Sequence, residues 1–478
     1  MMPTNRQGLL VFAAWATLTC SGCAPALPVI KNDSLPLPTI FPGADPNSAS
    51  TAIKSWKDFF GDLGLNNLIE AGLTNNQEIH ILEQEIYIAS NELFARQGEY
   101  LPKLGFRGGL GVEKIPKFTS QGKSDLANNV PNPLALGSMG LVSTWEIDIW
   151  KKLRNASKAA YFSYLSSIEV RKLLVTHMVA EMANVYFDLL ALDNQLETVN
   201  SYVELLQEIK TMAVLEQTAA RVTSLAVKRF EAEILKNKSR QFQLQQKIVV
   251  TQNALNSLAG RFPQDLPRDI KGFLQIKFAK IDTGIPTSLL DNRPDIKSAA
   301  FDLEAAQLSV SSAKARFYPS LSIEAGAGFE SFNSNHFLDI PKSVAYNLGT
   351  NLTAPLLNRQ AIKAAYFTAN NKQIQAVYRY EQVLIKAFAE VLNQLNAITN
   401  MDAVFDLKSR QLSALNESVV ISKLLFQNAR VDYLEALLTQ RDALEAQIEL
   451  IEVKRLQLSA HVNLYKALGG GWKSAEPS

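Results

Sequence analysis

The chain has 478 residues, and its 48 Lys and Arg nearly balance its 46 Asp and Glu, so the formal net charge is only +2. This balance argues against a nucleic-acid-binding protein, which needs a basic surface to neutralise phosphates. Hydrophobic residues make up 47% of the chain, too many for a disordered protein, and the only two cysteines lie at positions 20 and 23, which excludes a disulfide framework further on.

The first 22 residues are predicted to be an export signal peptide. Arg6 precedes an uncharged run over residues 9–19 that is too short to span a bilayer. Ser21-Gly22-Cys23 then resembles a bacterial lipobox, although Cys20 stands where that motif usually has Leu. The resemblance implies a diacylglycerol and an N-acyl chain such as palmitate on Cys23; an ordinary signal peptide with an incidental cysteine is the alternative. Residues 23–52, rich in Pro, Asn and Ser, are predicted to form an extended lipidated segment.

Very long helices are predicted from the placement of glycine and proline. Residues 141–259 and 356–468 contain neither, whereas helices in globular proteins average about 11–12 residues. A reversal at residues 220–222 would divide the first stretch into arms of about 60 and 38 residues, roughly 85 and 55 Å long. In the last arm, residues 437–465, apolar side chains recur at alternating steps of four and three, which indicates a coiled-coil seam interrupted by Arg441 and Arg455.

An internal repeat divides the chain into two halves. Lys158–Phe162 recurs unchanged as Lys363–Phe367, and Ala220-Arg221-Val222 recurs as Ala429-Arg430-Val431. Three short matches in the same order make chance an unsatisfactory explanation, the third being Pro102-Lys103-Leu104 with Pro319-Ser320-Leu321. We therefore predict two structural repeats, residues 53–260 and 288–472, with a linker over 261–287 and a tail over 473–478.

Each repeat is predicted to carry one pair of strands. Alternation with period 2 places them at about 103–113 and 139–149, and at about 320–330 and 344–354. One face is apolar and the other is polar or glycine, which suits a transmembrane β-barrel, although a half-buried soluble sheet gives the same alternation. Because four strands cannot close a barrel and open edges do not survive in lipid, several copies would have to share one. Two copies would supply about 8 strands and three about 12, enough for a lumen.

Several motifs resemble the TolC-like outer membrane efflux protein family, especially its lipid-anchored NodT-type members. They are Trp145–Trp150, Leu289–Ile296, Ala313–Leu321, Tyr433–Ala436 and Leu464–Trp472, and the resemblance covers about residues 53–472. It implies a mainly α-helical fold with a transmembrane β-barrel, in which a homotrimer builds a 12-stranded barrel in the outer membrane and a long α-helical barrel in the periplasm. It also implies the exit duct of a tripartite efflux system, whose partners are a periplasmic adaptor and an inner-membrane pump of RND type.

In this family the two helix reversals form the periplasmic tip, where the duct closes at rest. The residues that the resemblance assigns to a gate are Arg221, Phe426, Arg430, Asp432 and Glu435. The acids would attract cations, and the arginines would form ion pairs that hold the tip closed. This chain departs from the family pattern at Leu438, which stands in place of a second acid, and a solvated turn is the alternative interpretation of these charges.

No enzymatic site is predicted. His177 and Glu181 stand four residues apart on a helix, but no second pair accompanies them, so packing is favoured over metal binding. We expect no metal, no cofactor apart from the covalent lipid on Cys23, and no nucleic-acid partner. Two alternatives stay open, a lipid-anchored periplasmic helical adaptor or scaffold and the outer membrane component of type I protein secretion. The exported solute, whether drug, metal or protein, is not indicated.

Overall fold

The computed structural model of the chain describes residues 24–27, 38, 41, 54–219, 222–279, 281–284, 286–332, 336–357, 359–427 and 433–473. The chain divides into two compact units, each assembled from both halves of the sequence. The first unit comprises residues 1–33, 86–166 and 300–379, and the second comprises residues 34–85, 167–299 and 380–478.

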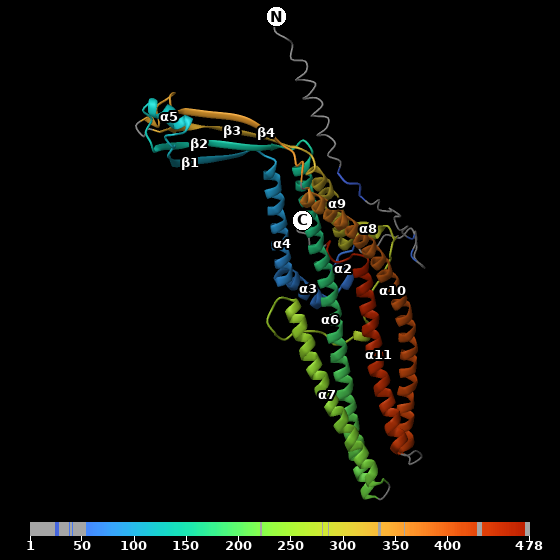
Figure 1. Cartoon of the computed structure of the whole chain (residues 1–478). Coiled ribbons are helices and arrows are strands. Elements are labelled where there is room, and N and C mark those ends of the chain that lie inside the picture. Colours follow the sequence, from blue (N-terminus) through green and yellow to red (C-terminus); the bar gives the residue numbers. More distant parts are fainter. Residues whose placement is uncertain are drawn as a thin grey trace. The chain divides into compact units, whose positions relative to one another are not determined.

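The first unit contains a four-stranded antiparallel sheet. Its strands are β1 (Lys103–Glu113), β2 (Leu134–Ile147), β3 (Ser320–Ser331) and β4 (Val344–Thr353), which lie side by side in this order (Figure 1). Each half of the sequence supplies one hairpin, and β2 pairs with β3 to join them. The sheet is thus a single surface shared by the two sequence repeats.

Two features between the strands differ from the sequence expectation. β2 begins at Leu134 rather than near residue 139 and ends at Ile147, because its first residues still pair with the end of β1. A short helix, α5 (Ser120–Ala127), lies in the connection between β1 and β2. The hydroxyl of Thr119 caps this helix by accepting a hydrogen bond from the Gly122 backbone N–H at 3.1 Å.

The helices repeat in length as well as in sequence. They are α2 (Trp56–Phe60), α3 (Leu63–Asn75), α4 (Gln77–Glu99), α6 (Lys152–Thr218), α7 (Ser224–Leu258), α8 (Ser288–Asn292), α9 (Pro294–Ala315), α10 (Gln360–Gln427) and α11 (Tyr433–Ala467), with a 3-10 turn, η2 (Phe273–Gln275), in the linker. α6 and α10 have 67 and 68 residues, and α7 and α11 have 35 each. The first arm is therefore longer than the predicted 60 residues, about 100 Å at 1.5 Å per residue, because the helix begins close behind β2.

The core of the second unit lies along α6 and α11, and it includes the predicted seam. Ile451, Leu458 and Val462 of α11 are at most 1% exposed, as are Met182 and Leu189 of α6. α6 has a stretch long and apolar enough to cross a membrane, but most of this stretch is buried within the protein. Core packing therefore accounts for its hydrophobicity.

The end of α11 forms hydrogen bonds and close contacts with the start of the second repeat. Arg293, 7% exposed, donates to the Ala467 carbonyl at 2.8 Å and to Glu390 at 2.9 Å, and also pairs with Asp295. Gly469 has φ +85°, and a Cβ there would lie 2.5 Å from the Asn292 carbonyl oxygen, so only glycine fits. These contacts hold the two ends of the second repeat together within one unit.

Candidate functional site

The sheet has one apolar face and one face of glycine and polar residues. Partners across the strands share a face, and one row consists of Phe106, Leu141, Ala327 and Tyr346. The adjacent row, on the other face, consists of Arg107, Gly140, Gly328 and Ala345. The large apolar side chains are exposed, including Leu104 (71%), Leu110 (95%), Leu348 (77%) and Leu352 (71%). A water-facing sheet would not present such a continuous apolar face, so the pattern suits lipid.

The glycine face allows an unusually close approach where the two repeats meet. A Cβ on Gly328 would lie 2.2 Å from the Met139 carbonyl oxygen, and one on Gly140 would lie 2.6 Å from the Ala327 carbonyl oxygen. Gly349 of the same face has room, since nothing lies within 4 Å of a Cβ built there. Glycine is therefore required at the β2–β3 junction for packing.

Both edges of the sheet are open in the described part of the chain. β1 pairs only with β2, and β4 pairs only with β3. Their outer N–H and C=O groups have no strand partner, and such edges are not stable in hydrocarbon. If the apolar face contacts lipid, the edges must pair with strands of other copies.

Two tryptophans mark the end of the sheet at which the helices begin. Trp150 donates to the Pro319 carbonyl oxygen at 2.8 Å and stacks on Tyr318 with ring centroids 4.7 Å apart. Trp145 donates to the Tyr100 carbonyl oxygen at 3.0 Å. Both indoles remain more than a third exposed, so each combines an apolar ring with a satisfied polar group. Such side chains are typical of the interface between hydrocarbon and water.

In the second unit, α7 and α10 each carry an apolar stripe that no described residue covers. On α7 the buried seam includes Phe230 and Ile248, whereas Leu235, Phe242 and Val249 are 62%, 72% and 53% exposed. These three recur every seven residues, which is the spacing of a second coiled-coil seam. On α10, Leu407 and Ile421 are 62% and 57% exposed, and they lie two heptads apart. A helix with two seams is suited to packing between two neighbours.

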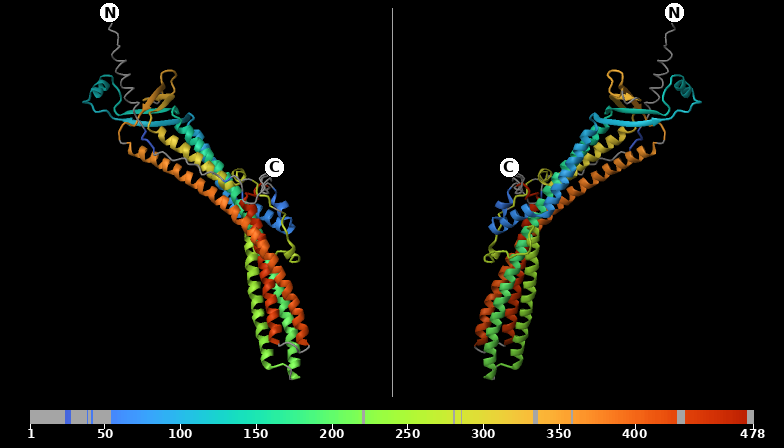
Figure 2. Two further views of the ribbon diagram at one scale, coloured as in Figure 1. Left: turned by 90° about the vertical axis from the view of Figure 1, so that its right-hand side faces the viewer. Right: turned by 90° about the vertical axis from the view of Figure 1, so that its left-hand side faces the viewer.

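The starts of α7 and α11 lie together in the second unit. The rings of Phe230 and Tyr433 are 6.4 Å apart, and Figure 2 shows the lower ends of α6, α7, α10 and α11 side by side in both views. Of the predicted gate residues, Glu435 is exposed in the first turn of α11, where the helix dipole favours a carboxylate, and Phe426 is half-buried at the end of α10. Arg221, Arg430 and Asp432 lie outside the described residues, as does Cys23.

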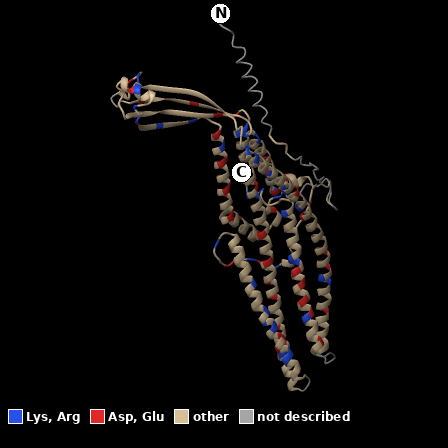
Figure 3. Ribbon diagram, in the orientation of Figure 1, with Lys and Arg blue, Asp and Glu red and all other residues tan. Residues whose placement is uncertain are grey.

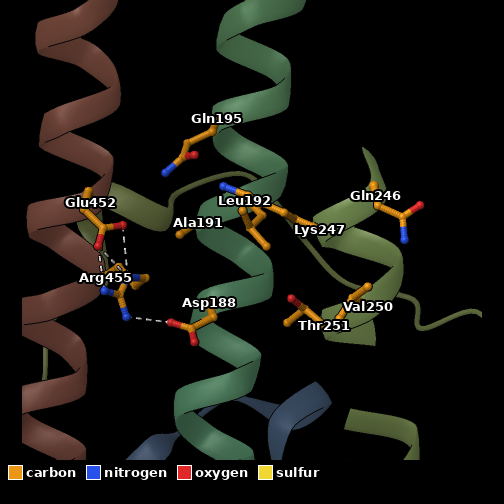
Figure 4. A pocket seen from close by; sticks show the side chains of 10 residues that line it. All are labelled: Asp188, Ala191, Leu192, Gln195, Gln246, Lys247, Val250, Thr251, Glu452 and Arg455. Atoms are coloured by element: carbon orange, nitrogen blue, oxygen red, sulfur yellow. Dashed lines mark hydrogen bonds and ion pairs between the residues drawn. The ribbon is translucent and has the colours of Figure 1, made fainter. Parts of the chain in front are cut away.

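A polar cluster lies where α6, α7 and α11 meet (Figure 4). The sequence indicated only one of its members. Arg455, one of the two arginines in the predicted seam, donates to Asp188 at 2.8 Å and to Glu452 at 2.6 Å. These hydrogen bonds, above all the one that Arg455 donates to Glu452, raise the pKa of Arg455 above its ordinary value, although burial opposes them. Beside the cluster is a cavity of about 450 Å³ that is also lined by Lys247. The interrupted seam indicated Arg455, but no local signal indicated Asp188.

In the part of the chain that the structure describes, histidine and carboxylate side chains do not converge on a metal site. Within the described ranges no group of three or more such side chains could hold a metal ion. The candidate pair His177 and Glu181 lies on α6, where burial lowers the pKa of His177. Nothing in this geometry assigns a chemical reaction to the chain.

Comparison with known proteins agrees with this geometry. Residues 68–261 and 285–470 match the family described as outer membrane efflux protein, one copy of the match for each repeat. The pyoverdine export outer membrane protein OpmQ of Pseudomonas aeruginosa is 26% identical over 98% of both chains. The solvent efflux pump outer membrane protein SrpC of Pseudomonas putida is 28% identical over 97% of this chain and 98% of its own.

The fold is also that of solved outer membrane channels. The crystal structure of the open state of the MtrE channel of Neisseria gonorrhoeae has a TM-score of 0.83 and 22% identity, covering 94% of this chain and 99% of its own. The predicted TolC-like fold is thereby confirmed. The match to this family favours an efflux channel over the periplasmic adaptor or scaffold that the sequence left open.

Proposed function

Because this chain belongs to the outer membrane efflux protein family, we propose that three copies form one exit duct across the outer membrane and the periplasm. The observation that carries the proposal is the four-stranded sheet with an exposed apolar face and two open edges. Three copies would contribute about twelve strands, which is wide enough for a lumen, whereas about eight strands would be filled by side chains. The glycine and polar face would then line the lumen.

The helical seams support the same arrangement. α7 and α10 each present an apolar stripe that lacks a partner in the described part of one copy. If the stripe on α7 of one copy packs against the stripe on α10 of the next, this head-to-tail contact can close into a ring of copies. Phe242 and Leu407 lie at similar depth, each about 20 residues, or roughly 30 Å, from its helix reversal. We assign them to the same level of the interface between copies.

The proposed duct is anchored by lipid on Cys23. Ala24, which directly follows that cysteine, and Leu27 pack against a cluster that includes Phe317 and Tyr366 in the first unit. Phe317 is next to Tyr318, which stacks on the interfacial Trp150. A diacylglycerol and an N-acyl chain on Cys23 would therefore enter the membrane close to the end of the sheet.

The partners of the duct are proposed from the same premise. A channel through one membrane needs a source of solute, so the chain would join a periplasmic adaptor and an inner-membrane pump, of RND type, in a tripartite system. Relatives named for pyoverdine export and for solvent efflux suggest small organic solutes as the cargo. Type I protein secretion is a less supported use of the same duct.

Assembly can be tested by disulfide crosslinking in outer membranes. Mature chains would offer no free thiol, because Cys20 leaves with the signal peptide and Cys23 is acylated. The variant with Phe242→Cys and Leu407→Cys should give a three-chain band on a non-reducing gel. Phe242→Cys with Ile421→Cys, about 20 Å out of register, is the matched control and should stay unlinked. Monomers alone in both variants would contradict the trimer.

The gate hypothesis has a separate test. Asp432→Asn with Glu435→Gln should change the conductance and lower the cation preference of the duct in planar bilayers, because a ring of carboxylates attracts cations. Arg221→Gln with Arg430→Gln should raise the open probability if these arginines hold the tip closed, and Phe426→Tyr should lower it by adding a hydroxyl. Unchanged conductance and selectivity in all three variants would remove the gate assignment.

A further inference from the structure

The two ends of the sheet differ in charge. At the end where the helices begin, residues 99–103, 146–158, 314–320, 354–357 and 359–363 include nine basic and three acidic residues. At the opposite end, residues 113–134, 330–332 and 336–344 include four of each. In Figure 3 blue segments gather where the strands join the helices. The excess of positive charge is therefore confined to the helix side of the sheet.

The few acids on the helix side are already engaged. Glu146 pairs with Lys152, and Asp148 accepts hydrogen bonds from the Arg154 side chain at 3.2 Å and backbone at 2.9 Å. Glu99 pairs with Arg96 at 3.1 Å. Six further basic side chains are exposed and form no ion pair within the described part of the chain. One of them, Lys103, is the first residue of β1, and the other five lie outside the strands: Lys151, Lys158, Lys314, Arg316 and Lys363. These five, here called the basic collar, all belong to the first unit.

The collar lies at the level of the interfacial aromatic residues. Lys151 follows Trp150 directly, and Arg316 is two residues from Tyr318. Lys158 and Lys363 open the repeated pentapeptide, so each repeat places a lysine at the same point, within roughly 10 Å of the start of its helix. This distance is close to the depth of the lipid headgroup region and to the Debye length of about 8 Å.

We propose that the basic collar binds the phosphate groups of anionic phospholipids in the leaflet next to the helices. The inference rests on the proposed function, since it requires the sheet to lie in a bilayer. Long lysine and arginine side chains can place their charge among headgroups while their stems lie along apolar surface. Each such charge near an anionic surface enriches anionic lipid about fivefold. The collar would thus fix the depth of the barrel and surround it with anionic lipid.

The inference can be tested by tryptophan quenching in vesicles of phosphatidylcholine and phosphatidylglycerol in equal parts. Bromine is placed on one lipid at a time, near the headgroup. Trp145 and Trp150 are the reporters, whereas Trp56 and Trp472 are buried, 1% and 9% exposed, and give a constant background. The wild-type protein should be quenched at least about twofold more by brominated phosphatidylglycerol, and 0.5 M salt should weaken this preference. Replacing all five collar residues by Gln should abolish it.

Matched controls separate the possible outcomes. Lys114→Gln, Lys117→Gln and Lys123→Gln together remove charge at the opposite end of the sheet and should leave the preference unchanged. If the variant that replaces all five collar residues does not assemble, the double variant Lys158→Gln with Lys363→Gln should still lose part of the preference for phosphatidylglycerol. Equal quenching by both lipids in the wild type, or an intact preference in the collar variants, would overturn the inference.

Two further results separate lipid binding by the collar from failure of the proposed duct and from binding of free phosphate. No quenching by either brominated lipid would mean that the sheet does not enter the bilayer, which would overturn the proposed duct itself. Sodium phosphate and sodium chloride at the same ionic strength should weaken the preference equally. A loss specific to phosphate would assign the collar to free anions and overturn the lipid assignment.

Discussion

Substitution of Gly328 tests whether a close approach of strands β2 and β3 joins the two repeats. In Gly328→Ala the new Cβ would lie 2.2 Å from the Met139 carbonyl oxygen, so β2 and β3 must separate by roughly 1 Å or more to restore ordinary contact. Loss of about two ladder hydrogen bonds at about 1 kcal/mol each, with about 1–3 kcal/mol of strain, should lower the free energy of unfolding by about 3–5 kcal/mol.

Gly349→Ala is the matched control for this change. It makes the same substitution on the same face of the sheet, but no atom lies within 4 Å of the new Cβ, so the effect should stay within about 1 kcal/mol. The assay is the temperature at which the proposed trimers dissociate on gels of unheated samples, followed together with the far-ultraviolet circular dichroism signal of the strands. Gly328→Ala should dissociate several degrees lower than wild type. If the two variants dissociate at the same temperature, the reasoning on the β2–β3 junction is wrong.

Three predictions concern the second unit. Arg293→Met breaks a buried ion pair and leaves the Ala467 carbonyl without its donor, so hydrogen exchange should increase over residues 464–472, with a loss of about 3–5 kcal/mol. Burial lowers the pKa of Lys454 to about 8. Lys454→Met should therefore raise the free energy of unfolding by about 1–3 kcal/mol at pH 7. This gain should shrink as pH rises from 8 to 10.5. In that range Lys454 is protonated in the unfolded chain but not in the folded one, so the wild type becomes more stable as pH rises. A cycle of Asp188→Asn and Arg455→Met should give a coupling energy of only about 1 kcal/mol in thermal unfolding, because both side chains are partly exposed; a value above about 3 would contradict this.

The sequence by itself determined the elements and their faces. The absence of Gly and Pro over residues 141–259 and 356–468 allows long helices, because these residues are the main breakers of a helix. Period-2 alternation placed the strands β1, β3 and β4 within a residue of their observed ends, because neighbouring residues of a strand point to opposite faces. Both rules are local, so one sequence was sufficient to apply them.

Only the tertiary structure decided which distant residues meet. Nothing near Asp188 in the sequence indicates that it pairs with Arg455, and nothing near Gly140 indicates that its opposite partner is Gly328. The helix α5 was missed because a helix of only 8 residues, about two turns, is too short to show a clear periodicity. The start of β2 was predicted too late because its first residues do not alternate. The basic collar joins three separate segments that share one level only after the sheet and helices have formed. Pairing between distant segments depends on the packing of the whole unit, which local sequence patterns do not encode.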